Sequence, residues 1–191
     1  MERLSTLDPE SLSPRQRDVY DKVAGTRGGV RGPFAVLLRC PEIADGVQAL
    51  GAQLRFAGGL PGRLRELAIL TTARFWTAQY EWAAHAPIAE KEGLDPAVID
   101  AIAQWRKPVF DAAEEKAVYD FCHESLGRRR VGDDTYARAL ESLGEDGVVE
   151  LAAVVGYYSL ISTVLNAFEV APRDGAVPLD GEPAGAAGDR P

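Results

Sequence analysis

The chain has 191 residues, a length that fits one domain. Hydrophobic residues make up 46% of it and charged residues 26%, which is the ordinary composition of a folded globular protein. A formal net charge of −8 offers no basic face for phosphate groups, so it argues against nucleic acid and against an anionic membrane surface as partners.

A helix start is expected at Ser13, with Pro14 at the first helical position and Gln16 three residues after the cap. This helix should stop at Gly25. The segment 25–34, GTRGGVRGPF, is expected to be a loop because its four glycines release the backbone. It lacks the GK[ST] of a phosphate-binding loop, and it could serve as a lid over a pocket.

Further helices follow in chain order. We expect a short helix at 34–38, one from Pro41 to the glycines at 58–59, and two over 61–93 that meet near 76–78. The remaining helices are expected at 95–105, 111–127, 133–144 and 144–170.

Alternating β-branched runs, the pattern of strands, are nearly absent from the sequence. The sequence therefore predicts an all-α domain of roughly eight helices over residues 1–172. The Gly-, Ala- and Pro-rich tail 173–191 should be flexible, or an arm across a neighbouring subunit.

One stretch raises the question of a membrane. Residues 151–168, LAAVVGYYSLISTVLNAF, carry no charge over 18 positions, near the lower limit for a membrane span. The stretch also contains tyrosine, serine, threonine and asparagine, and no basic cluster flanks it. We expect instead a helix that is buried centrally or between subunits.

Cysteine is sparse, with Cys40 and Cys122 far apart and no Cys-x-x-Cys. The sequence therefore supports neither a dithiol redox motif nor a thiolate zinc site, and no metal or cofactor is expected. A disulfide is conceivable, but two packed thiols in a reducing cytoplasm are the simpler interpretation. The polar segment 1–18 lacks the apolar core of a signal peptide.

Possible acid/base chemistry lies in QYEWAAHAPIAEKEG, residues 79–93. Glu81 and His85 are four apart, so they share one face of a helix, where a carboxylate favours the protonated imidazole. If the two helices of 61–93 form a hairpin, Glu66 returns toward His85, and Tyr80 could donate a hydrogen bond. Spacing alone equally fits a solvated Glu–His pair, with Glu66 bound to a neighbouring arginine.

The block LRELAILTTARFWTAQYEWAAHAPIAEKEGL, residues 64–94, closely resembles the carboxymuconolactone decarboxylase family, which includes AhpD-like alkylhydroperoxidases. VGYYSLISTVLNAFEV, residues 155–170, is similar to the closing helix of that family. The resemblance implies an AhpD-like fold that assembles as a trimer or a dimer of trimers. The redox branch of the family carries Glu-x11-Cys-x2-Cys-x3-His. Laid on this chain, that pattern places the two cysteine positions at Ala78 and Glu81.

Because both sulfurs are missing, the resemblance implies the decarboxylase-like branch, and a thiol peroxidase is disfavoured. The implied activity is cofactor-independent decarboxylation of a small carbonyl- or lactone-bearing carboxylic acid. The family's reference substrate is γ-carboxymuconolactone, from aromatic catabolism. His85 would be the general acid or base, oriented by Glu81, while Glu66 would hold or relay the proton. Residues expected to contact the substrate are Tyr80, Trp82, Arg74 and Asn166, with Arg55, Arg63 and Arg65 as further candidates for a carboxylate.

Two alternatives remain open at this point. One is a lactone isomerase or hydrolase that uses the same acid/base residues. The other is a ligand-binding family member without turnover. Sequence alone does not separate them from the decarboxylase.

Overall fold

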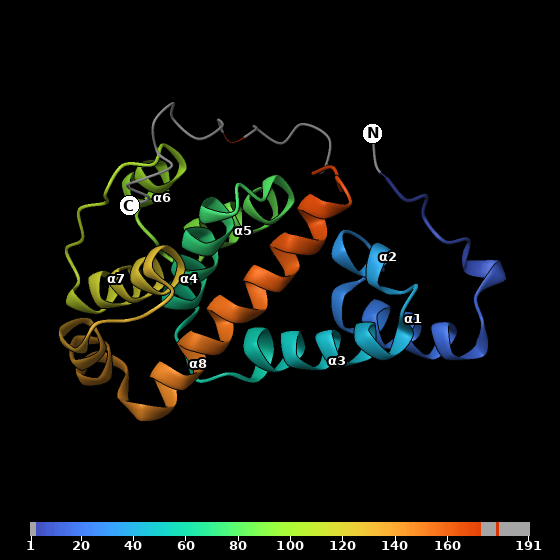
Figure 1. Cartoon of the computed structure of the whole chain (residues 1–191), viewed down its shortest axis with the longest axis horizontal. Coiled ribbons are helices and arrows are strands. Elements are labelled where there is room, and N and C mark those ends of the chain that lie inside the picture. The colour runs from blue at the N-terminus through green and yellow to red at the C-terminus, as the bar shows by residue number, and fades with distance from the viewer. Residues whose placement is uncertain (1–2, 173–178, 180–191) are drawn as a thin grey trace.

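The computed structural model describes residues 3–172 and 179. Its described part contains eight α-helices and no strand (Figure 1). The all-α prediction is therefore confirmed. The expectation of a flexible tail over 173–191 falls, apart from Leu179, outside the described residues.

The first helix, α1, spans Pro14–Arg27 and begins with the predicted capping box at Ser13. It ends later than expected, because Gly25 continues the helix and Gly28 provides the left-handed cap with φ 70°. A glycine inside a helix costs only about 1 kcal/mol, whereas the positive φ at the cap favours glycine strongly. Arg27, predicted to lie in a loop, is consequently fixed on the last turn of α1.

The other elements follow the predicted order. A 3-10 turn at Pro9–Ser11 precedes α1, and a π-helix at Gln53–Ala57 continues directly from α3. The remaining helices are α2 (Pro33–Leu37), α3 (Pro41–Ala52), α4 (Gly62–Phe75), α5 (Gln79–Lys91), α6 (Pro96–Ala103), α7 (Ala113–Arg128) and α8 (Asp133–Ala167).

The long helix α8 is broken where the sequence predicted a boundary. Gly144 has φ 70° and ψ 176°, which lie outside the helical region, so the two expected helices meet there with a kink. By length and composition α8 is apolar enough to cross a membrane, and half of its most apolar window is buried in the structure. It packs against α4 and α7, which is the central position expected from its sequence.

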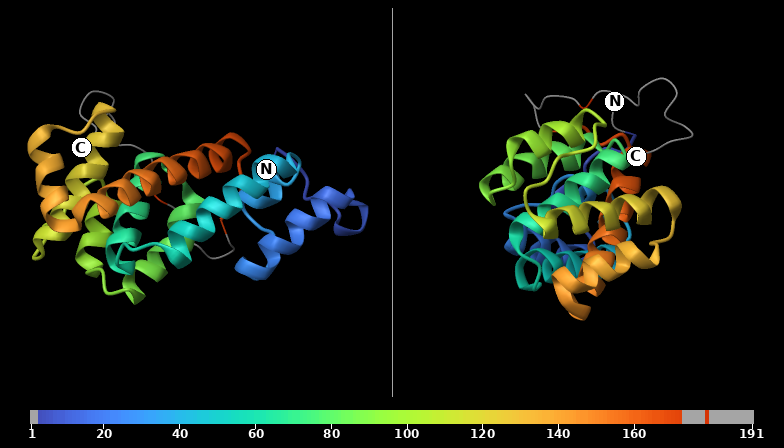
Figure 2. Two further views of the ribbon diagram at one scale, coloured as in Figure 1. Left: turned by 90° about the horizontal axis from the view of Figure 1, so that it is seen from below. Right: turned by 90° about the vertical axis from the view of Figure 1, so that its left-hand side faces the viewer.

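Helix α4 lies at the centre of the molecule. It packs against α5, α7 and α8, and Leu67, Ile69 and Leu70 on it are fully buried. The helices α1, α2 and α3 extend from one end of this bundle, as both figures show (Figures 1 and 2). The core is thus built around the helix that carries Glu66.

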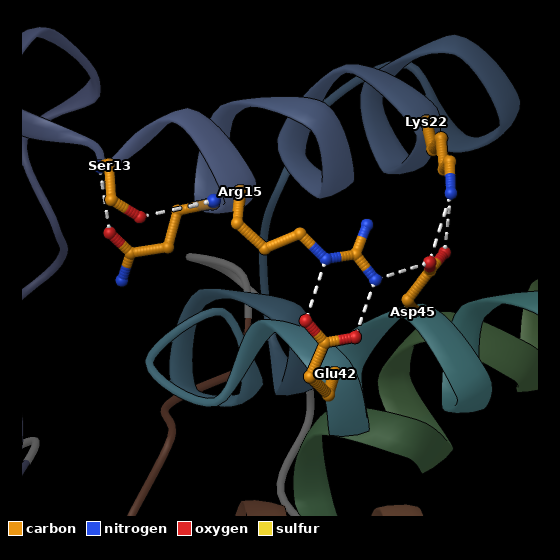
Figure 3. A network of polar contacts seen from close by, with 6 residues as sticks. Ser13, Arg15, Lys22, Glu42 and Asp45 are labelled. Atoms are coloured by element: carbon orange, nitrogen blue, oxygen red, sulfur yellow. Dashed lines mark hydrogen bonds and ion pairs between the residues drawn. The ribbon is translucent and has the colours of Figure 1, made fainter.

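Helix α1 is attached to α3 by a surface group of charged residues that we call the α1–α3 charge network: Arg15, Lys22, Glu42 and Asp45 (Figure 3). Arg15 donates from Nε and Nη2 to the two carboxylate oxygens of Glu42, at 2.8 and 2.7 Å. Arg15 and Lys22 also bind Asp45. The hydrogen bond from Arg15 lowers the pKa of Glu42, and those from Lys22 and Arg15 lower the pKa of Asp45.

Candidate active site

A tight turn folds α5 back beside α4 and brings an imidazole between two acids. The turn contains Thr77, whose φ is 47°. Nδ1 of His85 lies 2.6 Å from Oε2 of Glu66 on α4, and its Nε2 lies 3.3 Å from Oε2 of Glu81, one turn earlier on α5. All three side chains are buried. We call this group the buried triad.

The geometry of the buried triad favours a charged imidazole. Each ring nitrogen of His85 faces a carboxylate oxygen, an arrangement that the imidazolium satisfies with one proton on each nitrogen. Burial opposes the positive charge, but hydrogen bonds to Glu66 and then Glu81 outweigh it, so the pKa of His85 is raised above 6.5. The ring of Tyr158 packs edge-on against the imidazole of His85, with the two ring centres 5.2 Å apart.

The buried triad borders a cavity of about 540 Å³. Glu81 and His85 line this cavity, whereas Glu66 lies behind the imidazole, with Arg65 Nε 3.7 Å from its Oε1. The triad is therefore ordered from Glu66 in the interior to Glu81 at the cavity. Such an order suits proton transfer, because the reacting group is accessible while its partner is shielded from water.

The predicted substrate contact Tyr80 also lines the cavity. Its ring lies against Gly32, where an added Cβ would be 2.4 Å from Tyr80 Cζ. Gly32 also has φ 57°, so this position requires glycine on two counts. The glycine-rich segment 25–34 thus shapes the cavity wall, as a lid would.

Three other predicted contacts lie elsewhere. Trp82 follows Glu81 by one residue, so it points about 100° away, into the core. Arg74 is buried on α4 away from the cavity, with its guanidinium 4.5 Å from the Trp105 ring. Asn166 donates to the Trp76 backbone oxygen at 2.7 Å. None of these three residues lines the cavity, so a contact of any of them with substrate stays a prediction without support from this geometry.

The cavity instead contains cationic and phenolic groups from distant segments. Arg27 and Arg31 come from the end of α1 and the loop after it, and Arg55 comes from the π-helix. Tyr157 of α8 completes the wall, and burial raises the pKa of its hydroxyl. The sequence indicated Arg55 only as one of several arginines. Arg27 was missed because α1 was expected to end before it.

Sulfur takes no part in this site. Cys40 is exposed and Cys122 is buried in the core, where burial raises its pKa, and neither lines the cavity. Within residues 3–172, no group of three or more His, Cys, Asp or Glu side chains is arranged to hold a metal ion.

Comparison with solved structures places this fold among known ones. An alkylhydroperoxidase AhpD core protein from Ralstonia eutropha JMP134, described as an uncharacterized peroxidase-related protein, aligns with TM-score 0.74 at 21% identity, covering 93% of this chain and 97% of that one. A variant of the debrominase Bmp8, in complex with 2,3,4-tribromopyrrole, aligns with TM-score 0.72 at 13% identity, covering 91% and 95%. A peroxidase-related protein from Silicibacter sp. TM1040 gives 0.71 at 15% identity, covering 92% and 93%.

These similarities and the helical arrangement define an AhpD-like fold. Residues 41–124, which contain the whole buried triad, match the carboxymuconolactone decarboxylase family. This central segment of the chain is therefore similar to the carboxymuconolactone decarboxylase family, and the chain as a whole has the AhpD-like fold. No curated protein gives a significant match.

Proposed function

We propose that this protein is a cofactor-independent decarboxylase of a small carbonyl- or lactone-bearing carboxylic acid. The observation that carries the proposal is the buried triad at the edge of a cavity whose described lining residues include no thiol. The cavity has the volume of a small-molecule site. Its chemistry is that of proton transfer, with a carboxylate at the position where redox relatives carry a cysteine.

The reaction needs one proton and an electron sink in the substrate. The bond between the carboxylate carbon and its neighbour breaks, CO2 leaves, and the electron pair moves onto the adjacent carbonyl or conjugated system. Tyr80 and Tyr157 line the cavity, and in this proposal the hydroxyl of one of them donates a hydrogen bond to the resulting enolate oxygen. A proton from the enzyme then converts that carbon to a C–H bond, and solvent restores the proton.

The two hydrogen bonds of His85 assign roles to its nitrogens. Nδ1 is bound to Glu66 at 2.6 Å, which fixes the ring and supports its charge. Nε2 is 3.3 Å from Glu81, a longer and weaker contact, and lies on the side of the cavity. In this proposal the proton on Nε2 is the one delivered to substrate. Glu81 orients the imidazole ring and can accept a proton when the substrate is deprotonated.

The proposal is tested with a panel of β-keto acids and unsaturated lactone acids. We expect release of CO2 and incorporation of one deuterium from D2O into the product. His85→Gln should lower kcat by about 100-fold to 10,000-fold, the usual contribution of a general acid. The matched control is His123→Gln, which changes the only other histidine, a half-buried residue outside the cavity, and should leave kcat unchanged.

Other outcomes identify the alternatives. A product of unchanged mass would indicate a lactone isomerase, and addition of water a hydrolase. Ligand binding that His85→Gln leaves intact, without reaction of either protein, would indicate a binding protein. Thiol-dependent peroxide turnover would revive the peroxidase, although neither cysteine lies at the site.

We also propose that the protein is a homo-oligomer. Several large apolar side chains are exposed on α3, the π-helix and α8, which pack against one another: Ile43, Leu50, Phe56, Val149 and Leu160. Exposed large apolar side chains on adjoining helices are typical of an interface between subunits. Light scattering after gel filtration should give a multiple of 20.6 kDa. Phe56→Ser should shift the mass toward that of the single chain, and a wild-type mass of 20.6 kDa would contradict the proposal.

A further inference from the structure

The cavity contains arginines that have no carboxylate partner among the described residues. Acidic residues outnumber lysines and arginines, 29 to 21, and several arginines of this protein bind a carboxylate, as Arg15, Arg63 and Arg106 do. Arg27 and Arg55 form no such ion pair with any described residue. Both are only partly exposed, and both line the cavity. With Arg31, which donates to the Gly28 backbone oxygen and also has no ion pair within the described part of the chain, they make the cavity locally cationic within an acidic protein.

The guanidinium of Arg27 has an unused hydrogen-bonding edge. It lies 4.6 Å from the centre of the Phe34 ring, so its plane is supported by an aromatic face. Its Nε and Nη2 are buried and have no hydrogen-bond partner among the described residues. In Arg15, the same two nitrogens donate to the carboxylate of Glu42 (Figure 3). Buried donors on a charged group are costly to leave unpaired, so an arriving carboxylate relieves that cost.

Arg55 approaches from another element. It stands in the π-helix Gln53–Ala57, and its guanidinium is supported by the ring of Phe56 at 5.2 Å. Single π turns in helices often occur at functional sites, and this one ends the helical stretch that begins at Pro41. Arg27 lies beside the Tyr157 hydroxyl, because a Cβ added at Gly51 would be 2.1 Å from that hydroxyl and 2.6 Å from Arg27 Nη2. Arg55 lines the same cavity, and the charges of both arginines oppose the rise in the pKa of Tyr157.

From these contacts we infer that Arg27 and Arg55 form a clamp for the carboxylate of the substrate, and that they select small carboxylic acids over their neutral esters and amides. This inference rests on the proposed function in taking the cavity as the substrate site. Negative charge leaves the carboxylate as CO2 forms, so the clamp stabilises the reactant at least as much as the transition state. Loss of the clamp should therefore raise KM more than it lowers kcat.

Binding of an unreactive acid tests the clamp directly. Paraconate, a saturated γ-lactone acid, and its methyl ester are titrated into the full chain by calorimetry. We expect the acid to bind at least about 10-fold more tightly than the ester. Arg27→Gln and Arg55→Gln should each weaken binding of the acid by about 10- to 100-fold, the value of a charged hydrogen bond, and leave binding of the ester unchanged. Arg27→Lys keeps the positive charge but loses the two-pronged guanidinium, so its affinity for the acid should lie between those of wild type and Arg27→Gln.

The matched control is Arg17→Gln, on the same helix but outside the cavity, with unchanged binding expected. Circular dichroism establishes that each variant is folded. Equal affinity for acid and ester, no binding of either, or wild-type affinity in both arginine variants would overturn the clamp. Tight binding of the acid without CO2 release from any substrate would overturn the decarboxylase and leave the clamp intact. CO2 release with unchanged KM in both arginine variants would overturn the clamp and leave the decarboxylase intact.

Discussion

The α1–α3 charge network and the buried triad each join two helices through charged side chains, but in different surroundings. In the network the carboxylates are solvated, and two cations satisfy them. In the triad one imidazole lies between two buried carboxylates, and its charge is kept against the cost of burial. Exposed pairs add little stability and are screened by salt, whereas a buried charge must be compensated closely. The contrast separates a structural contact from a site equipped to handle protons.

The largest effect on stability is expected from removing the central charge of the triad. His85→Ala leaves two buried carboxylates without their cation and should lower the free energy of unfolding by about 3–5 kcal/mol. The folded pKa of His85 is raised above the unfolded value of 6.5, so its stabilising contribution is complete below pH 6.5 and is lost as pH rises through the folded pKa. Urea denaturation at several pH values should show a smaller difference from wild type at high pH. A difference that grows with pH would contradict this protonation scheme.

The next effect concerns the pH dependence of the reaction. Glu66→Gln removes the closest carboxylate of His85, so it should lower the pKa of the imidazole and reduce kcat by about 100-fold. Since the protonated form is the acid, the fall in activity on the alkaline side should move to lower pH. A pH–rate profile that keeps its position would show that Glu66 does not support the charge of His85.

A smaller effect is expected where the cavity wall meets α3. A Cβ at Gly51 would lie 2.1 Å from the Tyr157 hydroxyl and 2.6 Å from Arg27 Nη2. Gly51→Ala should therefore displace both groups, lower stability by about 1–3 kcal/mol and weaken binding of paraconate. Gly46→Ala on the same helix meets nothing within 4 Å and should be neutral or slightly stabilising. Equal behaviour of the two variants in melting and calorimetry would refute the tight fit at Gly51.

The smallest effect belongs to the surface network. Asp45→Asn removes a carboxylate that Arg15 and Lys22 share, so the melting temperature should fall only slightly at low salt. The difference from wild type should disappear near about 1 M salt, where the screening length is about 3 Å. A large, salt-independent loss would mean that the network holds α1 more firmly than exposed charges ordinarily do.

Local sequence rules predicted most of the fold. The capping box at Ser13, the helix-initiating prolines and the boundary at Gly144 depend on neighbours along the chain, and all three occur in the structure. The end of α1 was misplaced because either Gly25 or Gly28 could have stopped the helix. Only the latter adopts the left-handed conformation.

The site was predictable only where residues share a helix or a known pattern. Glu81 and His85 follow from helical spacing, and Glu66 from the resemblance together with the hairpin. Arg27, Arg55 and Tyr157 reach the cavity from three separate elements, which no periodicity indicates. Arg74 lies outside the cavity because it stands two turns after Glu66, about 80° further around α4, with its guanidinium against the Trp105 ring.

The wide turn at Gln53–Ala57 separates two requirements that a regular helix would tie together. A π turn holds one residue more than an α turn, so Arg55, which lies inside it, is displaced around the helix from the position that regular winding would give it. Helix α3 therefore keeps its packing against α1 while Arg55 is aimed independently at the cavity. Deleting one residue from this segment would restore ordinary winding and turn the guanidinium away. A change of one residue in chain length would thus remove a cation from the cavity and leave the contacts between α3 and α1 in place.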